Sequence, residues 1–315
     1  MLQFEKINTV LVIGGGVMGP GIALSYARGG YTVRLADISE TALETSKRAI
    51  EGHLETMAEV GEIETEGKAQ ISERVSYLAD IKKAAEGVGF IAEAITERKD
   101  AKKALYEHLD TFLPEEAIIA SNTSFLNIFE LMPARRQPYA VISHWYDPPH
   151  IIPLVEVVRG PETEECVMAI TAQMLERCKK VALRMEKFTP GFFVNLVQKA
   201  LGDVANYLVD NDFCTPEQFD VAIKSSVYPR GVVLGYFQKA DFSGIHTYGT
   251  VVMENGAEDA AKTLMGHYHR GEYGVRAGKG FFDYTGRDID GIFKERDRRL
   301  YEVMKIAMEN INNKL

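Results

Sequence analysis

The chain has few of the residues that would cross-link it or place it in a membrane. Its three cysteines form no Cys-x-x-Cys pair, and an odd number gives no complete disulfide framework. We therefore expect Cys166, Cys178 and Cys214 to be free thiols in a reducing cytosol. No apolar run approaches the ~20 residues that a membrane-spanning helix needs. The first residues, MLQFEKINTVLVIGG, lack the layout of a signal peptide, so we expect a cytoplasmic protein.

Basic residues are outnumbered by acidic ones, with 36 Lys and Arg against 45 Asp and Glu. The formal net charge of −9 argues against nucleic acid or an anionic membrane as the main partner. A few local Arg or Lys side chains are still enough to bind a small anion, and we expect no metal site. With 315 residues, of which 46% are hydrophobic and 26% charged, the chain is long enough for two globular domains.

The first half alternates between short apolar runs and longer helical patterns, which is typical of βαβ units and a parallel sheet. The expected strands are Val10–Ile13, Thr32–Ala36, Phe90–Ala94, Ala117–Ser121 and Ala140–Ser143. The expected helices between them are Met18–Arg28, Glu40–Val60 and Asp100–Phe112. The stretch from Glu40 to Glu73 resembles two charged helices joined near Gly61, an excursion longer than a plain crossover needs.

After Val158 the strand signal fades and helical patterns dominate. The expected helices there are Phe192–Asp210, Pro216–Ser226, Ala257–Tyr268 and Ile292–Asn312. We therefore predict an α/β protein with a mostly parallel Rossmann-type domain over residues 1–188 and an all-helical domain over residues 189–315.

The strongest local motif is VLVIGGGVMGPGIA, in which Gly14, Gly16 and Gly19 follow a buried-type strand and open a helix. The first glycine allows a tight turn, the second allows backbone to approach a pyrophosphate, and the third allows close helix–strand packing. Because a helix N-terminus attracts phosphate, these glycines with Val17 and Met18 form a candidate dinucleotide site.

Asp37 ends the second expected strand and completes this pattern. A carboxylate there accepts a ribose 2′-hydroxyl and repels a 2′-phosphate, and no Arg or Lys follows it closely. We therefore expect NAD rather than NADP. The alternative is a glycine turn of an unrelated α/β fold, with Asp37 as a helix cap.

Five later segments follow the glycine loop: AEAITERKDAK (92–102), SNTSF (121–125), SHWYDPPHIIPLVEVV (143–158), TPGFFVN (189–195) and RAGKGFFDY (276–284). In this order, and over nearly the whole chain, the motifs resemble the 3-hydroxyacyl-CoA dehydrogenase family. The resemblance implies dimerisation through the helical domain. By motif match, it also implies a catalytic set of Ser124, His144, Glu156 and Asn195 and places Glu97 and Lys102 near the cofactor.

These residue types suit the oxidation of an alcohol, which needs a base for the hydroxyl proton as hydride leaves carbon. His144 follows a strand at the edge where open α/β sheets bind ligands. Glu156 can hold one imidazole nitrogen and leave the other for the substrate. Ser124 and Asn195 can donate hydrogen bonds to the substrate oxygen.

Each residue also has a structural alternative. An isolated His at a strand end can be structural, Ser124 can cap a helix near Leu126, and Asn195 can be a buried polar group with its hydrogen bonds satisfied. Glu97 and Lys102 can form a solvated helix start.

Three departures from the family pattern bear on the substrate. Asp147 stands where the family usually has Asn, three residues after the catalytic His. The excursion reads ETMAEVGEIETEGK, which is acidic where coenzyme A-using relatives tend to carry lysines. YPRGVVLG replaces the usual PMGP-like turn.

The strings PPHIIPLVEVV and R-x-x-x-x-G are more similar to a branch of the family that acts on free acids. That branch includes L-gulonate 3-dehydrogenase (lambda-crystallin), carnitine dehydrogenase and an enzyme that oxidises a formyl-pyridine carboxylate. Arg230 would then be a fork for the substrate carboxylate, with a surface salt bridge as the alternative. His150 and Asp147 lie close to the motif and are further candidate substrate contacts.

We therefore predict an NAD-dependent dehydrogenase that oxidises the secondary alcohol, at C3, of a small hydroxy acid, or catalyses the reverse reduction. One alternative is a 3-hydroxyacyl-CoA dehydrogenase of the 3-hydroxybutyryl-CoA type. Another is a non-catalytic, crystallin-like protein that binds NAD, against which the intact catalytic set argues.

Overall fold

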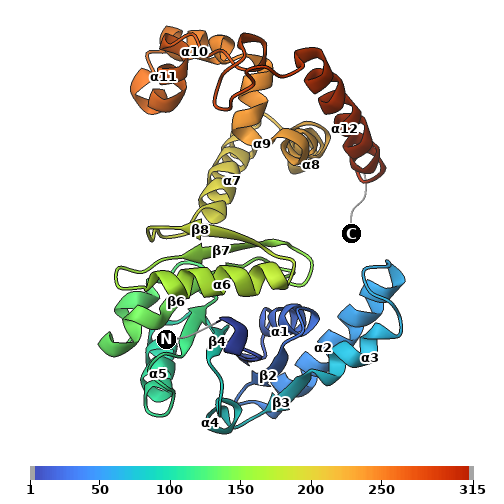
Figure 1. The fold of residues 1–315 in the computed structure, drawn as a ribbon. Helices are drawn as coiled ribbons and strands as arrows, with labels where there is room; N and C mark the ends of the chain where they lie inside the picture. The colour runs from blue at the N-terminus through green and yellow to red at the C-terminus, as the bar shows by residue number, and fades with distance from the viewer. Residues whose placement is uncertain (1–3, 312–315) are drawn as a thin grey trace. The chain divides into compact units, whose positions relative to one another are not determined.

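The computed structural model describes residues 4–311 and divides the chain into two compact units, Met1–Lys199 and Ala200–Leu315. The first unit contains a sheet with helices on both faces, and the second is built from helices (Figure 1). The predicted fold class, a Rossmann-type sheet followed by a helical region, is confirmed.

The described residues form an eight-stranded sheet in the order β3-β2-β1-β4-β5-β6-β7-β8. Its strands are β1 Thr9–Ile13, β2 Thr32–Ala36, β3 Val75–Leu78, β4 Phe90–Glu93, β5 Ile118–Ser121, β6 Ala140–Trp145, β7 Leu154–Val158 and β8 Val181–Met185. The strands from β3 to β6 pair in parallel, β7 runs antiparallel to β6, and β8 is parallel to β7.

Helices cover both faces of this sheet because its strands are apolar on both sides. In β1, Val10 and Val12 pack into one core with side chains of α1, α2 and α6, whereas Leu11 and Ile13 pack into another with side chains of α5. Such alternation follows from the two-residue period of a strand. The helices are α1 Gly19–Arg28, α2 Glu40–Glu59, α3 Gly67–Glu73, α4 Ile81–Ala84, α5 Lys99–Asp110 and α6 Glu165–Arg177.

The five expected strands are present, and so is the two-helix excursion, whose turn holds Gly61 at a φ of 76°. The five expected strands did not include β3, β7 or β8, and β8 lies beyond Val158, where the strand signal of the sequence fades. β8 is an edge strand whose apolar side chains are partly exposed, with Val181 58% exposed, so it lacks the fully buried pattern of β4, β5 and β6.

The helical region begins with α7, which crosses from the first unit into the second. Its helices are α7 Val194–Asp210, α8 Pro216–Ala222, α9 Tyr228–Ser243, α10 Ile245–Glu254, α11 Lys262–His269 and α12 Ile289–Glu309, with a π-helical turn at Ile223–Val227. Short 3-10 turns lie at Phe4–Lys6, Ile128–Glu130, Ala134–Tyr139, Glu258–Ala261 and Val275–Ala277. The expected end of the last helix at Asn312 lies outside the described residues. Among residues 4–311, no helix combines the length and apolar character that a membrane crossing needs.

A buried carboxylate organises the second unit. Asp241 of α9 is 2% exposed and accepts hydrogen bonds from the backbone N–H groups of Phe281 and Phe282 and from the Tyr284 hydroxyl. The GKGFFDY segment is therefore tied to α9. All three cysteines of the chain are free thiols, as expected.

Candidate active site

The glycine loop has the geometry that a dinucleotide requires. Gly14 has a φ of 113°, and a Cβ there would lie 2.5 Å from the Ala94 carbonyl oxygen. A Cβ on Gly19 would lie 1.8 Å from the Gly14 carbonyl oxygen, so α1 packs closely on β1 only with glycine. A Cβ on Gly16 would meet no described atom within 4 Å, which leaves its backbone approachable from outside. This geometry is compatible with the three roles suggested by the sequence, and contact of these glycines with a dinucleotide stays a prediction.

The N-terminus of α1 is also free to receive a phosphate. Within the described chain, its N-cap Met18 makes no side-chain capping hydrogen bond, and the first turn carries no acidic residue. Val17, beside it, is 82% exposed. A pocket of about 540 Å³ opens here, lined by Gly15, Gly16, Val17, Pro20, Ser39, Thr41, Ala42, Thr45, Ala49 and His53. Backbone N–H groups and the helix dipole at such a terminus stabilise a pyrophosphate.

Asp37 follows β2, as predicted, and supports the same loop. Its Oδ2 accepts the Gly15 backbone N–H at 2.7 Å, and its Oδ1 accepts the Ser39 backbone N–H at 2.8 Å. An ionised carboxylate has about four acceptor positions, so two hydrogen bonds leave capacity for a ribose hydroxyl. The residues present therefore fit NAD.

His144 and Glu156 form a buried pair across β6 and β7. They are directly opposed in the antiparallel register, and His144 Nδ1 lies 2.9 Å from Glu156 Oε2. Burial raises the pKa of Glu156, but hydrogen bonds from His144, Tyr146 and two backbone amides outweigh it and hold that pKa below its ordinary value. Since an ionised carboxylate only accepts, Nδ1 carries a proton and Nε2 is left for a substrate.

Glu156 also fixes the first turn of α7. Its Oε1 accepts the backbone N–H groups of Phe193 and Val194 at 2.9 and 3.0 Å. Phe192 packs beside the imidazole, with its ring centroid 5.0 Å from that of His144. One carboxylate therefore joins the imidazole to the segment that carries Asn195.

Ser124 and Asn195 belong to two segments that meet near this pair. A Cβ on Gly191 would lie 3.5 Å from the Phe125 ring and 3.7 Å from Asn195 Cβ. The Ser124 loop is attached to β6, because Asn122 Oδ1 accepts the Trp145 backbone N–H at 2.8 Å. The loop after β5, the end of β6 and the start of α7 thus converge.

Glu97 binds the loop of residues 122–127 after β5, here called the Ser124 loop, through several hydrogen bonds. Its Oε1 accepts the Thr123 hydroxyl at 2.6 Å and the backbone N–H groups of Ser124 and Phe125 at 2.8 and 2.9 Å. Burial raises the pKa of Glu97, yet these hydrogen bonds and Lys102 bring it below its ordinary value. Contact of Glu97 with the cofactor stays a prediction.

Lys102 is buried within a polar network that the sequence analysis missed. Its Nζ lies 2.7 Å from Oε1 of the fully buried Glu93, whose Oε2 accepts the hydroxyls of Tyr106 and Ser121. Lys102 is therefore not part of a solvated helix start. The available signal was an acidic residue at the end of the apolar strand FIAE.

The candidate substrate residues His150, Asp147 and Arg230 make other contacts than hydrogen bonds to His144 or Glu156 in the described structure. His150 is buried and stacks on His53 with ring centroids 3.8 Å apart, and burial with nearby cations lowers its pKa to about 4. Asp147 is exposed. Arg230 is exposed on α9 in the second unit, where its guanidinium donates to the carbonyl and hydroxyl of Ser226.

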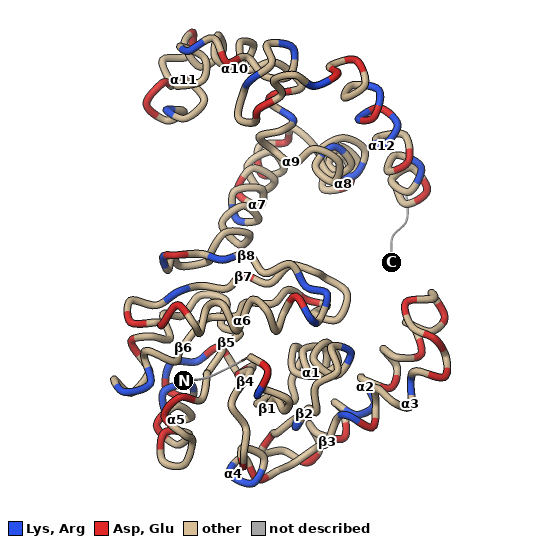
Figure 2. The backbone as a smooth tube through the Cα atoms, viewed as in Figure 1, with Lys and Arg blue, Asp and Glu red and all other residues tan. Residues whose placement is uncertain are grey.

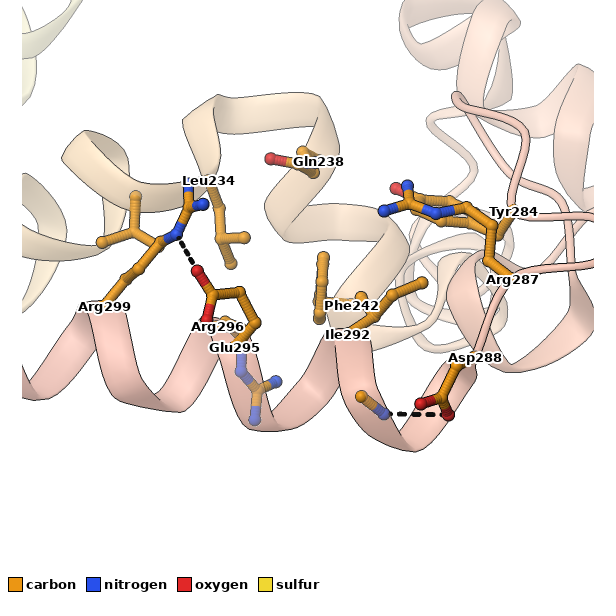
Figure 3. A pocket seen from close by; sticks show the side chains of 12 residues that line it. Leu234, Gln238, Phe242, Tyr284, Arg287, Asp288, Ile292, Glu295, Arg296 and Arg299 are labelled. Atoms are coloured by element: carbon orange, nitrogen blue, oxygen red, sulfur yellow. Dashed lines mark hydrogen bonds and ion pairs between the residues drawn. The ribbon is translucent and has the colours of Figure 1, made fainter.

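The second unit has a pocket of its own, of about 460 Å³, between α9 and α12 (Figure 3). Two of its arginines are already paired, Arg299 with Glu295 at 2.7 Å and Arg296 with Asp297 at 2.6 Å. Asp288 caps α12 through the Gly291 backbone N–H. We assign no catalytic chemistry to this pocket.

Comparison with known proteins agrees with this geometry. Residues 9–188 match the NAD binding domain of 3-hydroxyacyl-CoA dehydrogenase, and residues 191–284 match its C-terminal domain. The chain is 29% identical to 5-formyl-3-hydroxy-2-methylpyridine 4-carboxylate 5-dehydrogenase of Mesorhizobium japonicum, covering 95% of this chain and 98% of that one. It is 33% identical to a probable 3-hydroxybutyryl-CoA dehydrogenase of Bacillus subtilis, covering 89% and 98%.

A solved structure of a 5-formyl-3-hydroxy-2-methylpyridine 4-carboxylic acid 5-dehydrogenase, described as an NAD⁺-dependent dismutase, superposes with a TM-score of 0.72. The match has 27% identity and covers 96% of this chain and 99% of that chain. The chain belongs to the 3-hydroxyacyl-CoA dehydrogenase family. It is an NAD-dependent oxidoreductase that acts on a CH–OH group, as the sequence predicted.

Proposed function

We propose that the chain oxidises the C3 hydroxyl of a small free hydroxy acid with NAD⁺, or reduces the corresponding ketone. The buried His144–Glu156 pair carries the proposal, because it presents an oriented imidazole beside the Ser124 loop and the start of α7. His144 takes the hydroxyl proton, and Glu156 holds the ring and stabilises its protonated form. Bound NAD⁺ supplies the hydride acceptor.

Ser124 and Asn195 complete the proposed catalytic set by donating hydrogen bonds to the substrate oxygen. Both side chains are half-buried, so they combine access with a defined position. Val17 and Met18 at the glycine loop, with Glu97 and Lys102 behind the Ser124 loop, make up the rest of the proposed cofactor site.

The charge of the α2–α3 excursion supports a free acid over a coenzyme A thioester. Figure 2 shows acidic residues around the turn between these helices, where Glu59, Glu62, Glu64 and Glu66 are all exposed. Like charges here disfavour the phosphates of coenzyme A. We propose that Arg230 binds the substrate carboxylate and that His150 and Asp147 line the substrate path.

We propose a cofactor domain of residues 1–188 and a helical domain of residues 189–315. We also propose that the helical domain forms the dimer interface. Neither α7 nor α12 buries a residue among those described, and Tyr207, Val232 and Tyr301 are each more than half exposed. Exposed apolar helix faces of this extent are characteristic of protein–protein contacts. We further propose that this dimer is cytoplasmic, in keeping with its free thiols.

The test is a substrate panel that follows NADH absorbance and contains free 3-hydroxy acids and 3-hydroxybutyryl-CoA. The proposal expects turnover of at least one free acid and little turnover of the thioester. Efficient turnover of the thioester alone would instead support the second candidate, a 3-hydroxybutyryl-CoA dehydrogenase, which the 33% identity to the Bacillus subtilis relative favours. NADH binding without turnover of any substrate would support the other alternative, a non-catalytic, crystallin-like protein that binds NAD.

A further inference from the structure

Tyr146 donates to the same carboxylate oxygen as the catalytic histidine. Its hydroxyl lies 2.5 Å from Glu156 Oε2, the atom that His144 Nδ1 contacts at 2.9 Å. Its ring packs edge-on against the imidazole, with centroids 4.6 Å apart and planes at 61°. The side chain therefore contacts both members of the acid–base pair.

We propose that Tyr146 is a positioning residue, whose hydroxyl holds Glu156 Oε2 against His144 and limits how strongly this carboxylate stabilises a protonated His144. The proposal rests on the function proposed above, in which His144 is the acid–base. An alcohol oxidation needs His144 neutral before it accepts the proton, so a carboxylate that binds the protonated ring too strongly would oppose the reaction.

The direction of the effect follows from hydrogen-bond competition. A carboxylate oxygen that accepts a second donor carries less negative charge toward the first. Burial and the bond to Glu156 raise the pKa of Tyr146 well above its ordinary value, so the phenol stays protonated and remains a donor. Removing this hydroxyl leaves Oε2 to His144 alone and favours the protonated imidazole.

Within the described part of the chain, the groups that hydrogen-bond to Glu156 are the His144 ring, the Tyr146 hydroxyl and two backbone amides. From α7, the groups that reach Glu156 are the backbone amides of Phe193 and Val194, which do not titrate. The neighbouring Asp147 acts on His53 and His150, and Glu97 is engaged with the Ser124 loop. Among these donors to Glu156, the Tyr146 hydroxyl is the one, besides His144 itself, that a side-chain substitution can remove.

The test measures the titration of His144 directly by NMR of protein labelled at its seven histidines, with His144→Gln identifying the signal. We expect Tyr146→Phe, which keeps the ring contact, to raise the His144 midpoint by roughly half a unit to one unit. The acid limb of the kcat/KM profile for the best hydroxy acid of the panel should move by the same amount, while NAD affinity stays unchanged.

Tyr77→Phe is the matched control, because Tyr77 is a half-buried phenol on β3, the opposite edge of the sheet. Site-specific fluorotyrosine at position 146 is the second variant, since a more acidic phenol donates more strongly and should lower the midpoint. The proposal is overturned if the His144 midpoint stays the same in both Tyr146 variants, or if it moves by the same amount in Tyr77→Phe. Because the NMR readout needs no substrate, it remains decisive even if the panel finds no turnover.

Discussion

The carboxylate of Asp37 accepts the backbone N–H of Gly15 at 2.7 Å, across 22 residues of sequence. The acid proposed to bind the ribose therefore also shapes the loop proposed to bind the pyrophosphate. A change at Asp37 should consequently alter both cofactor choice and the geometry of the phosphate site.

We predict that the native enzyme binds NAD(H) more tightly than NADP(H). In Asp37→Ala, the ratio of the two affinities should fall by about tenfold to a hundredfold. The reason is the loss of a charge-assisted hydrogen bond to one cofactor and of a repulsion toward the other. Fluorescence titration with NADH and NADPH measures it. Asp37→Asn keeps an acceptor for the Gly15 amide and separates the effect of charge from that of loop geometry. A wild-type preference for NADP would contradict the assignment.

His144→Gln should lose about 100- to 10,000-fold in turnover, the usual contribution of general acid–base catalysis. NADH affinity should hardly change, because the glycine loop and Asp37 are untouched. Stopped-flow turnover and NADH titration of the same preparation give both quantities. Near-normal turnover would remove His144 from the mechanism.

Glu156→Gln should lower turnover and change its pH profile, because the protonated imidazole loses its partner. Stability should respond as well. The pKa of Glu156 in the folded protein lies below the ordinary 4.5, so the carboxylate stabilises the fold above pH 4.5 and loses this effect as the pH falls through the lower value. Urea unfolding of both proteins should therefore differ at pH 7 and converge in acid. A constant difference at all pH values would argue against it.

Glu93→Gln should destabilise the first unit by at most about 3–5 kcal/mol, the cost of an unpaired buried charge, because Lys102 loses its nearer carboxylate and keeps Glu97 at 3.5 Å. The double variant Glu93→Gln/Lys102→Met removes the buried charge and should recover part of the loss. Urea unfolding monitored at the single tryptophan compares the three proteins. Equal stability of the wild type and Glu93→Gln would mean that the pair is neutral.

Arg230→Met should raise KM for a free hydroxy acid about tenfold to a hundredfold, since a charge-assisted hydrogen bond is worth about 1.5–3 kcal/mol. NAD affinity should stay the same, because Arg230 lies on α9 in the helical unit. Arg298→Met, at an exposed arginine of α12, is the matched control. An enzyme that ignores free acids, turns over 3-hydroxybutyryl-CoA and tolerates Arg230→Met would disprove the carboxylate assignment.

The sequence by itself determined the features that depend on local chain chemistry. Five buried strands, the glycine loop and the two-helix excursion follow from apolar periodicity and from the conformational freedom of glycine, which neighbouring residues define. The family motifs then singled out His144 and Glu156, although no local rule predicts that residues twelve apart face each other.

The tertiary structure decided what depends on partners distant in the sequence. The edge strand β8 owes its place to pairing with β7 rather than to an apolar pattern of its own. Glu93 and Tyr146 are an ordinary acid and an ordinary phenol in sequence. Folding places Glu93 against the buried Lys102, and it places the partly buried Tyr146 against the buried Glu156. In that environment each hydrogen bond to a charge is strong and each unpaired group is costly, so their roles arise only from the folded arrangement.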